Sequence, residues 1–321
     1  MNYKPIVPGS TESSVLIFGC AGLMGRVDKK ASMRAVALAL EHGISHFDAA
    51  RSYGYGEAEG CLGEALQGCR RQVVITSKFG LLPSSKGAAV RFLKPIAQSL
   101  LRAFPGARGL LRKGVQSAGA GAVKGQFDLK TSTESLETSL RELKTHYIDL
   151  LLMHDCGEDD VTDGLVEFLE SLKRTGKIRA YGAAAGPETA KAIEARYPGQ
   201  FLFQLPDSVT RRSRNSWTPK KPFLTYGLLH RAKQVFQWAK EDPEGLRINE
   251  LGFLEESNVF ELMLQYGLLA NPSGAVICSM LNPIHLEANL RVVESPRFSP
   301  DQVEAFGRWI VGKVEASKEE F

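Results

Sequence analysis

The segment that decides the fold runs from residue 47 to residue 57 and reads Phe47-Asp48-Ala49-Ala50-Arg51-Ser52-Tyr53-Gly54-Tyr55-Gly56-Glu57. It follows a short apolar run, residues 44–47, which predicts a buried strand. An acid, a phenol and flexible glycines come directly after that strand. In a barrel of alternating strands and helices, catalytic groups gather at the C-terminal ends of the strands. Asp48 and Tyr53 are therefore the first candidates for catalysis.

Apolar runs alternate with helical patterns along the rest of the chain. Strands are predicted at 15–19, 44–47, 73–78, 147–153, 178–182, 201–205, 222–226 and 275–278. Helices are predicted at 31–42, 57–66, 162–174, 188–196, 257–266, 283–293 and 300–316. Repeats of this kind predict a (β/α)8 TIM barrel that spans residues 1–321 as a single domain with an extra C-terminal helix. A doubly wound sheet is the weaker alternative, because no G-x-G-x-x-G follows the first strand.

The alternation breaks after the third strand, at residues 81–130. This excursion is rich in glycine and carries nine lysines and arginines but one acid, Asp128. A loop of that length is unusual inside a compact domain, which predicts a lid over the barrel or a mobile insertion. Attachment to an anionic surface is a third reading. A helix should resume at Thr131, since Thr131 and Glu134 have the spacing of a capping box.

Composition narrows the class of protein. The chain has 321 residues, 43% of them hydrophobic and 24% charged, which is enough to bury a sizeable core. The chain has a net charge of +4, but the excursion alone carries +8, which leaves −4 on the remainder. This slightly acidic main body argues against a nucleic-acid partner. The five cysteines are scattered without zinc spacing, so we expect no metal site and a reducing compartment. Without a leader-like or membrane-spanning run, the sequence predicts a cytoplasmic protein.

Four ionisable residues follow predicted strands: Asp48, Tyr53, Lys78 and His154. Neighbouring strand ends of a barrel face one cavity. A lysine cation near the phenol should lower the pKa of Tyr53 from its ordinary value of about 10, and a carboxylate would hold that lysine in place. An imidazole could then orient a carbonyl oxygen. This set suits a general acid that protonates a carbonyl as a hydride arrives.

Each of these residues has a simpler interpretation when it is taken alone. Asp48 could be a turn aspartate, and Lys78 and His154 could be ordinary structural residues. Tyr55 could replace Tyr53 as the phenol, although the spacing from Asp48 favours Tyr53. Trp217 could line a substrate pocket, or it could be a structural tryptophan that is half-buried under a loop. The case for catalysis depends on the whole set.

Several longer motifs resemble the aldo/keto reductase superfamily, and the match covers nearly all of the chain. They are Gly43-Ile44-Ser45-His46-Phe47-Asp48-Ala49-Ala50, Tyr53-Gly54, Gly60-Cys61-Leu62-Gly63-Glu64-Ala65-Leu66, Ser135-Leu136-Glu137-Thr138-Ser139-Leu140-Arg141-Glu142-Leu143, Tyr147-Ile148-Asp149-Leu150-Leu151-Leu152-Met153-His154 and Gly176-Lys177-Ile178-Arg179-Ala180-Tyr181-Gly182. Any one of these motifs is weak evidence, but the set is specific.

The resemblance implies a (β/α)8 barrel that reduces an aldehyde, ketone or sugar carbonyl with NADP, or NAD as the alternative. It implies Tyr53 as proton donor, Lys78 and Asp48 as its tuning pair, and His154 as the group that orients the carbonyl. The cofactor residues that it implies are Gln204, Tyr226, Gly227, Leu228, Ser279, His285 and Asn289. Its partners would be small molecules, and the oligomeric state stays open.

The chain departs from the family pattern on the cofactor side. Ala184 and Ala185 stand where the family usually carries Ser-Asn, whose side chains hold the nicotinamide carboxamide. His285 stands where an arginine often meets the 2′-phosphate, and a histidine does not replace a bidentate arginine. These departures motivate an alternative from another class, in which the barrel is a catalytically weak nucleotide-sensing or scaffold protein.

Overall fold

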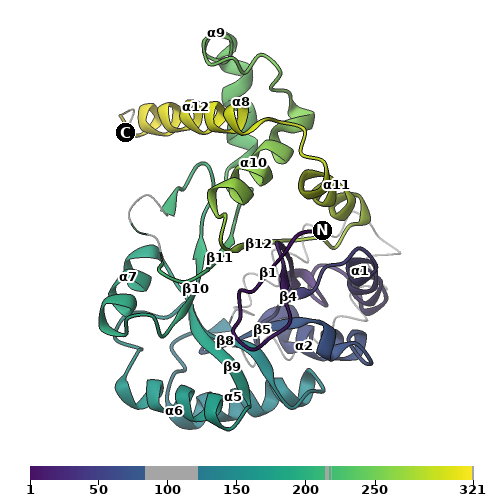
Figure 1. The fold of residues 1–321 in the computed structure, drawn as a ribbon, viewed down its shortest axis with the longest axis vertical. Coiled ribbons are helices and arrows are strands. Elements are labelled where there is room, and N and C mark those ends of the chain that lie inside the picture. The colour runs from purple at the N-terminus through teal and green to yellow at the C-terminus, as the bar shows by residue number, and fades with distance from the viewer. Residues whose placement is uncertain (84–121, 214–216, 218, 320–321) are drawn as a thin grey trace, which may run out of the picture.

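The computed structural model describes residues 1–83, 122–213, 217 and 219–319. Its centre is a closed barrel of parallel strands in the order β3-β4-β5-β8-β9-β10-β11-β12, with β12 paired back to β3 (Figure 1). The strands are β3 (Leu16–Gly19), β4 (His46–Asp48), β5 (Val74–Phe79), β8 (Ile148–His154), β9 (Ile178–Ala184), β10 (Leu202–Pro206), β11 (Leu224–Tyr226) and β12 (Ala275–Cys278). Each one coincides with a predicted strand, so the predicted (β/α)8 barrel is confirmed.

The strand register gathers polar side chains at the carboxyl end of the barrel. Asp48 is the last residue of β4, and Lys78 lies one residue before the end of β5. His154 ends β8 and is level with Ala184 on β9, which is level with Gln204 on β10. Because the strands are parallel, these ends open onto the same mouth.

Aliphatic side chains fill the barrel below this polar layer. They are Ile17, Val74, Leu150, Leu152, Ala180, Leu202, Leu224 and Ala275, and Ala184, level with His154, closes this cluster at the top. Ile6 and Val7 join the same cluster from the loop of an N-terminal hairpin, β1 (Tyr3–Lys4) paired with β2 (Ser13–Ser14). The sequence analysis did not predict this hairpin, whose strands are two residues long. The packed interior leaves the carboxyl end as the face on which a site can form.

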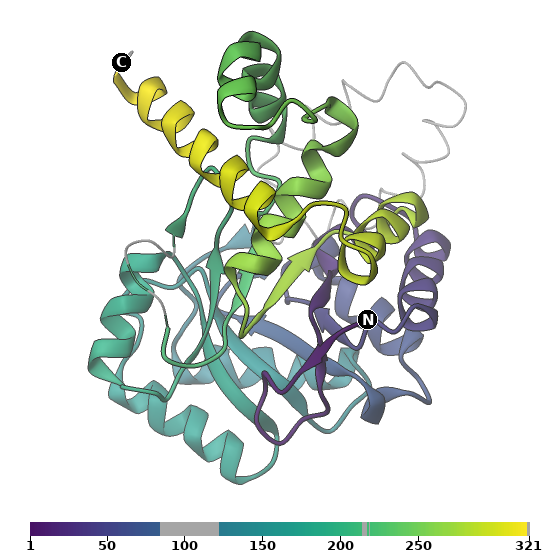
Figure 2. The ribbon, with the colours of Figure 1, turned by 45° about the horizontal axis from the view of Figure 1, so that its top comes forward.

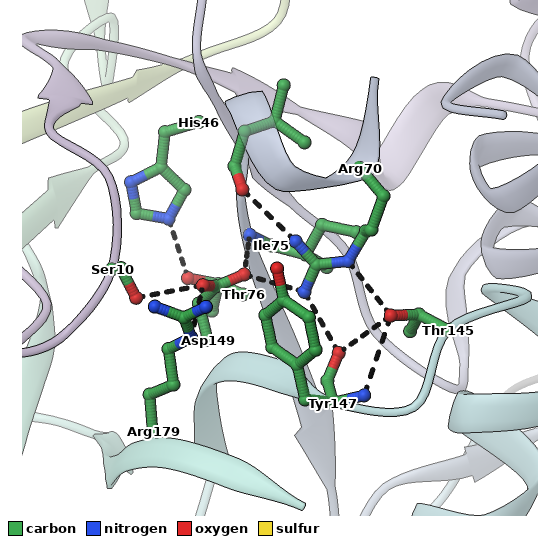
Figure 3. A network of polar contacts seen from close by, with 10 residues as sticks. Ser10, His46, Arg70, Ile75, Thr76, Thr145, Tyr147, Asp149 and Arg179 are labelled. Carbon is green, nitrogen blue, oxygen red and sulfur yellow. Dashed lines mark hydrogen bonds and ion pairs between the residues drawn. The ribbon is translucent and has the colours of Figure 1, made fainter. Parts of the chain in front are cut away.

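A polar network centred on Asp149 lies near the amino end of the barrel (Figure 3). The buried Asp149 carboxylate meets Ser10 Oγ at 2.8 Å, Arg70 Nη2 at 2.7 Å, the Ile75 backbone N–H at 3.0 Å and Arg179 Nε at 3.4 Å. Both guanidinium groups also lie over the ring of Tyr147, at 4.0 and 4.5 Å from its centroid. These contacts join the hairpin loop, β5, β8 and β9, which gives Asp149 a structural role.

Helices surround the barrel. They are α1 (Lys29–Glu41), α2 (Ala58–Ala65), α5 (Leu129–Glu142), α6 (Asp163–Arg174), α7 (Pro187–Arg196) and α11 (Pro283–Glu294), with 3-10 turns η1 (Cys20–Gly22), η2 (Tyr53–Gly56) and η3 (Arg70–Gln72). The predicted capping box at Thr131 is wrong. Helix α5 begins earlier, because the Asp128 carboxylate accepts the Thr131 N–H at 2.9 Å and caps the helix there.

A second group of helices projects from one side of the barrel (Figures 1 and 2). It contains α8 (Ala232–Glu241), α9 (Pro243–Ile248), α10 (Glu256–Ala270) and α12 (Pro300–Glu319). These helices share a core of their own, built around Val235, Leu262 and Phe306. The sequence predicted α10 and α12 but missed α8 and α9.

The two described ends of the excursion pair with each other, the first of them lying just after β5 in the chain. Strand β6 (Leu82–Pro83) pairs antiparallel with β7 (Ala122–Val123). Phe127 fills the space beside Gly80, where an added Cβ would lie 1.9 Å from its ring. The predicted lid or mobile insertion at 81–130 falls mainly on residues 84–121, which lie outside the described residues. Within the described ranges, no helix has both the length and the apolar character needed to cross a membrane.

Candidate active site

Lys78 is at the centre of the polar layer and is 1% exposed. Its ammonium lies 2.6 Å from Asp48 Oδ1, 3.0 Å from the carbonyl oxygen of Ala49 and 3.4 Å from the hydroxyl of Tyr53. The same nitrogen is 5.0 Å from the centroid of the Tyr53 ring. One buried cation therefore joins a carboxylate, a backbone carbonyl and a phenol.

The surroundings keep Lys78 charged. Burial alone lowers the pKa of Lys78, but the charges and hydrogen bonds of Asp48 and Tyr53 outweigh this and raise it. Burial raises the pKa of Asp48 above its ordinary value, and Lys78 and a hydrogen bond from the Gln204 amide only partly oppose this rise. With a 2.6 Å contact between them, the two groups form a buried ion pair.

Tyr53 is held on a tight turn, η2, that begins five residues after Asp48. Gly54 has φ +58, and an added Cβ would lie 2.4 Å from the carbonyl oxygen of Leu23. Only glycine fits so close an approach of two backbones. Tyr55 follows with φ 59, which is uncommon for a bulky residue. The hydroxyl that contacts Lys78 is that of Tyr53 rather than Tyr55.

The prediction that the pKa of Tyr53 is lowered is wrong for the protein without a bound ligand. Burial raises the pKa of Tyr53 above its ordinary value of 10.0, and Lys78 only partly opposes this. The ammonium is closer to Asp48 than to the phenol, so the carboxylate offsets much of its field. The phenol consequently stays protonated at neutral pH, which is the state that a proton donor requires.

His154 faces Tyr53 across the same mouth. The two rings meet edge to face, with centroids 5.8 Å apart. Burial, followed by the nearby Lys78 cation, lowers the pKa of His154 to about 3. The imidazole is therefore neutral and can donate one hydrogen bond. Its Nδ1 is buried and has no hydrogen-bond partner in the part of the chain that is described.

Gln204 supplies an unused acceptor beside these groups. It is 3% exposed, and its amide donates to Asp48. Its Oε1 is buried without a partner among the described residues. A primary carboxamide such as that of a nicotinamide could donate to this oxygen. Ala184 and Ala185 are also buried, but their methyl groups offer no hydrogen bond.

The remaining predicted cofactor residues follow β11 and β12. Tyr226 ends β11 and is 38% exposed, so one part of its ring is accessible. Gly227 has φ +78 and open space beside it. The side chain of Leu228 is buried in the core, close to Gly267, so only its backbone could reach a ligand.

Ser279 and His285 are exposed, and Asn289 is half-buried. Ser279 lies in the loop between β12 and α11, whereas His285 and Asn289 lie on α11. In the same loop, Met280 is buried and Leu281 packs against Gly22. The assignment of these residues to a nucleotide stays a prediction.

Sequence reasoning missed a buried acid next to the site. Glu59 on α2 accepts hydrogen bonds from Arg51 and Ser77 and is 1% exposed. The sequence did contain a signal for this buried acid. Glu59 has the spacing that places it on the same face of the helix as Leu62 and Leu66, which are both buried. A carboxylate on an apolar stripe needs partners in the core.

Two further contacts concern the rim of the site. Lys124, from the end of the excursion, forms an ion pair with Asp155, the residue after His154. Trp217 packs edge-on against the buried Phe203, with ring centroids 5.5 Å apart. Of the two interpretations of Trp217, this contact favours the half-buried structural one.

Comparison with known proteins defines the class. A model of the aldo/keto reductase family matches residues 15–199. The aldo-keto reductase YhdN of Bacillus subtilis strain 168 is 28% identical over 190 residues, which is 57% of this chain and 47% of YhdN. The chain thus matches about half the length of that relative.

Two solved structures cover nearly the whole chain. The holo form of an aldo-keto reductase from Bacillus halodurans has a TM-score of 0.72 at 22% identity and covers 96% of both chains. An aldo-keto reductase from Klebsiella pneumoniae in complex with NADPH has a TM-score of 0.65 at 19% identity, covering 96% of this chain and 95% of that one. These likenesses show the shared fold. The family model, which matches more than half of the chain, shows that the chain belongs to the aldo/keto reductase family, whose members are oxidoreductases.

Proposed function

We propose that the protein is a nicotinamide-dependent oxidoreductase that reduces an aldehyde, ketone or sugar carbonyl, or catalyses the reverse oxidation of an alcohol. One observation supports this above the others: the buried Lys78 ammonium contacts both Asp48, at 2.6 Å, and the Tyr53 hydroxyl, at 3.4 Å, at the mouth of the barrel. A cation in this place stabilises the negative charge that develops on a phenol as it gives up its proton.

Each side chain has a distinct role in this proposal. Tyr53 donates its proton to the carbonyl oxygen of the substrate. Lys78 stabilises the resulting phenolate, and Asp48 keeps Lys78 charged and in position. The neutral imidazole of His154 donates a hydrogen bond that orients the carbonyl oxygen and polarises it. His154 is suited to this role because its pKa of about 3 prevents it from adding a second positive charge to the site.

A reduced nicotinamide, when bound, supplies the hydride. The unpartnered Oε1 of Gln204 fits a carboxamide donor, and the accessible ring of Tyr226 offers a surface for stacking. We favour NADP, with NAD as the alternative, and assign Gly227, Leu228, Ser279, His285 and Asn289 to the nucleotide on the resemblance to the family. The similar protein from Klebsiella pneumoniae is known in complex with NADPH, which agrees with this choice.

Tyr53→Phe tests the proposed proton donor. This variant keeps the ring and removes only the hydroxyl, so we expect it to abolish turnover on an aldehyde panel. Binding of NADPH and NADH, measured by tryptophan quenching, should be almost unchanged. An unaffected rate would reject Tyr53 as the donor.

The same measurements test the alternative. The buried methyl groups of Ala184 and Ala185 favour a catalytically weak nucleotide-sensing or scaffold protein, since neither residue can hold a carboxamide through its side chain. Wild-type protein that binds a nicotinamide nucleotide but turns over no aldehyde would support the sensor. If neither nucleotide binds at millimolar concentration, the oxidoreductase proposal fails.

A further inference from the structure

We propose that Glu59 is a positioning residue for the reaction, because it holds together the two chain segments that carry Tyr53 and Lys78. This inference deepens the proposed function and depends on it for the link to catalysis. The hydrogen bonds of Glu59 go to Arg51 and Ser77 rather than to Tyr53 or Lys78. Its effect on the site would therefore pass through Arg51 and Ser77.

Both carboxylate oxygens of Glu59 are used. Oε2 accepts a hydrogen bond from Arg51 Nη1 at 2.8 Å, and Oε1 accepts one from Ser77 Oγ at 2.5 Å. The acid is 1% exposed, and the side chain of Arg51 is 13% exposed, so water screens this ion pair little. A charge-assisted contact of this kind fixes both partners strongly.

The two partners are placed where they control the site. Arg51 lies between Asp48 and Tyr53, in the segment that sets the position of the phenol. Ser77 directly precedes Lys78 on β5. The backbone of the two segments is joined firmly at Ala49, whose N–H donates to the carbonyl oxygen of Thr76 at 2.8 Å. Closer to Tyr53 the link is weaker, because the Arg51 N–H lies 3.5 Å from the carbonyl oxygen of Lys78. The carboxylate of Glu59 adds a stronger connection at this end.

The contact that Glu59 would protect is sensitive to small movements. The Lys78 ammonium lies 3.4 Å from the Tyr53 hydroxyl, near the limit of a hydrogen bond. Lys78 reaches it through a long flexible side chain, and Tyr53 sits on a short turn rather than in a helix or strand. A further separation would remove the hydrogen bond and weaken the charge interaction.

A buried ion pair could instead serve stability alone, and the chain offers a matched control for that reading. Asp149 is also 1% exposed and also binds an arginine, Arg70, at 2.7 Å. It is the second residue of β8, near the amino end of the barrel, whereas Lys78 lies near the carboxyl end of β5. Asp149 touches β5 through the Ile75 backbone N–H, two residues before Ser77, but its contacts do not include Arg51, Ser77 or Lys78. Asp149→Asn therefore removes a comparable buried charge and leaves both partners of Glu59 in place.

The experiment compares Glu59→Gln, Ser77→Ala and Asp149→Asn in the full-length protein. Gln at position 59 can still accept from Ser77 but no longer neutralises Arg51, whereas Ser77→Ala removes one hydrogen bond and leaves the ion pair. We expect Glu59→Gln and Ser77→Ala to lower kcat about tenfold or more, because small misplacements of reacting groups are costly. The Kd for NADPH should change less than about twofold, since uniform binding is unaffected. Asp149→Asn should lower Tm but keep kcat.

A second readout needs no substrate. The protein is labelled with 13C at tyrosine Cζ, and the NMR signal of Tyr53 is assigned as the one that is missing in Tyr53→Phe. The pH dependence of this signal then gives the pKa of Tyr53. Lys78 is the principal group that lowers the pKa of Tyr53, while Asp48 and Cys20 face the phenol and raise it. Moving the ammonium away should therefore raise the pKa of Tyr53 in Glu59→Gln and Ser77→Ala but not in Asp149→Asn.

The outcomes separate this inference from the proposed function. A raised pKa of Tyr53 in Glu59→Gln and Ser77→Ala supports the positioning role even if the wild type reduces no carbonyl, in which case the proposed function fails alone. An unchanged or lowered pKa of Tyr53 overturns the positioning role, whether or not kcat falls, because loss of the Glu59 charge by itself can only lower that pKa. If Glu59→Gln does not fold, the conservative Ser77→Ala variant decides the question by the same criteria.

Discussion

Lys78 is a fully buried cation whose place in the protein depends on the carboxylate of Asp48, 2.6 Å away. Lys78→Met should destabilise the protein by about 3–5 kcal/mol, because it leaves a buried carboxylate without its cation. The same variant should lose turnover, since no charge remains to stabilise a Tyr53 phenolate. Urea unfolding and an aldehyde reduction assay measure the two effects.

The double variant Asp48→Asn/Lys78→Met is the control for this prediction. It removes both charges, so stability should largely recover while activity does not. If the single and double variants are equally unstable, the loss comes from packing rather than from an uncompensated charge, and the electrostatic account is wrong.

Most of the catalytic set could be predicted because its members break the apolar pattern at strand ends. Asp48, Lys78 and His154 each follow or end a hydrophobic run, and the barrel topology then brings them together. The direction of the Tyr53 pKa could not be predicted in this way. It depends on how deeply the ring is buried and on which partner lies closer to the ammonium, and neither quantity is visible in spacing.

At the scale of whole elements, prediction succeeded where an element has a strong repeating pattern. The barrel strands are short apolar runs that are buried over most of their length, and each was located. Helix α9 has only six residues, and the residue before α8, Arg231, has a left-handed backbone with φ 56 and gives no capping signal. The hairpin β1–β2 was missed because two-residue strands have no periodicity to detect.

The network around Asp149 gives an element-scale prediction. Asp149→Asn should lower the free energy of unfolding by about 3–5 kcal/mol, because Arg70 and Arg179 would lose a buried counter-charge that links β5, β8 and β9. Activity should be retained, as the network lies near the end of the barrel opposite the site. Chemical denaturation and steady-state kinetics measure the two quantities.

An exposed ion pair provides the comparison for this variant. Glu244 and Arg247 pair within α9 and are both largely exposed to solvent. Glu244→Gln should leave stability nearly unchanged, since water already screens the pair. Equal effects from Glu244→Gln and Asp149→Asn would contradict the claim that burial makes the Asp149 network important.

For the whole molecule, three hydrophobic cores among the described residues stabilise the fold. The first fills the barrel, the second lies between the barrel strands and their helices, and the third lies within α8, α9, α10 and α12. Asp242 helps to join these last helices, because its carboxylate accepts from Trp309 Nε1 at 3.1 Å and from Lys313 Nζ at 2.7 Å on α12. The polar layer of the site belongs to the first core, so catalysis and overall stability share the same buried ionisable groups.

The buried histidines of the barrel predict how the stability of the protein depends on pH. Burial, followed by the field of Lys78, lowers the pKa of His46 to about 3, and the pKa of His154 is lowered to the same value. In the unfolded chain both should titrate near about 6.5. Below that pH the unfolded state binds protons that the folded state does not, so stability falls as the pH decreases from about 6.5 to about 3.

Each histidine should contribute a slope of up to about 1.4 kcal/mol per pH unit in that window. Urea unfolding at several pH values between 7.5 and 5 measures the slope, before most carboxylates begin to titrate. In His46→Gln, position 46 carries an amide that can still bond Ser13 or Thr76 but has no charge to gain. The slope should therefore fall by the contribution of one histidine, while His154 and His230, whose pKa burial also lowers, keep theirs. An identical slope in His46→Gln and wild type would mean that buried neutral histidines do not set the acid sensitivity of this barrel.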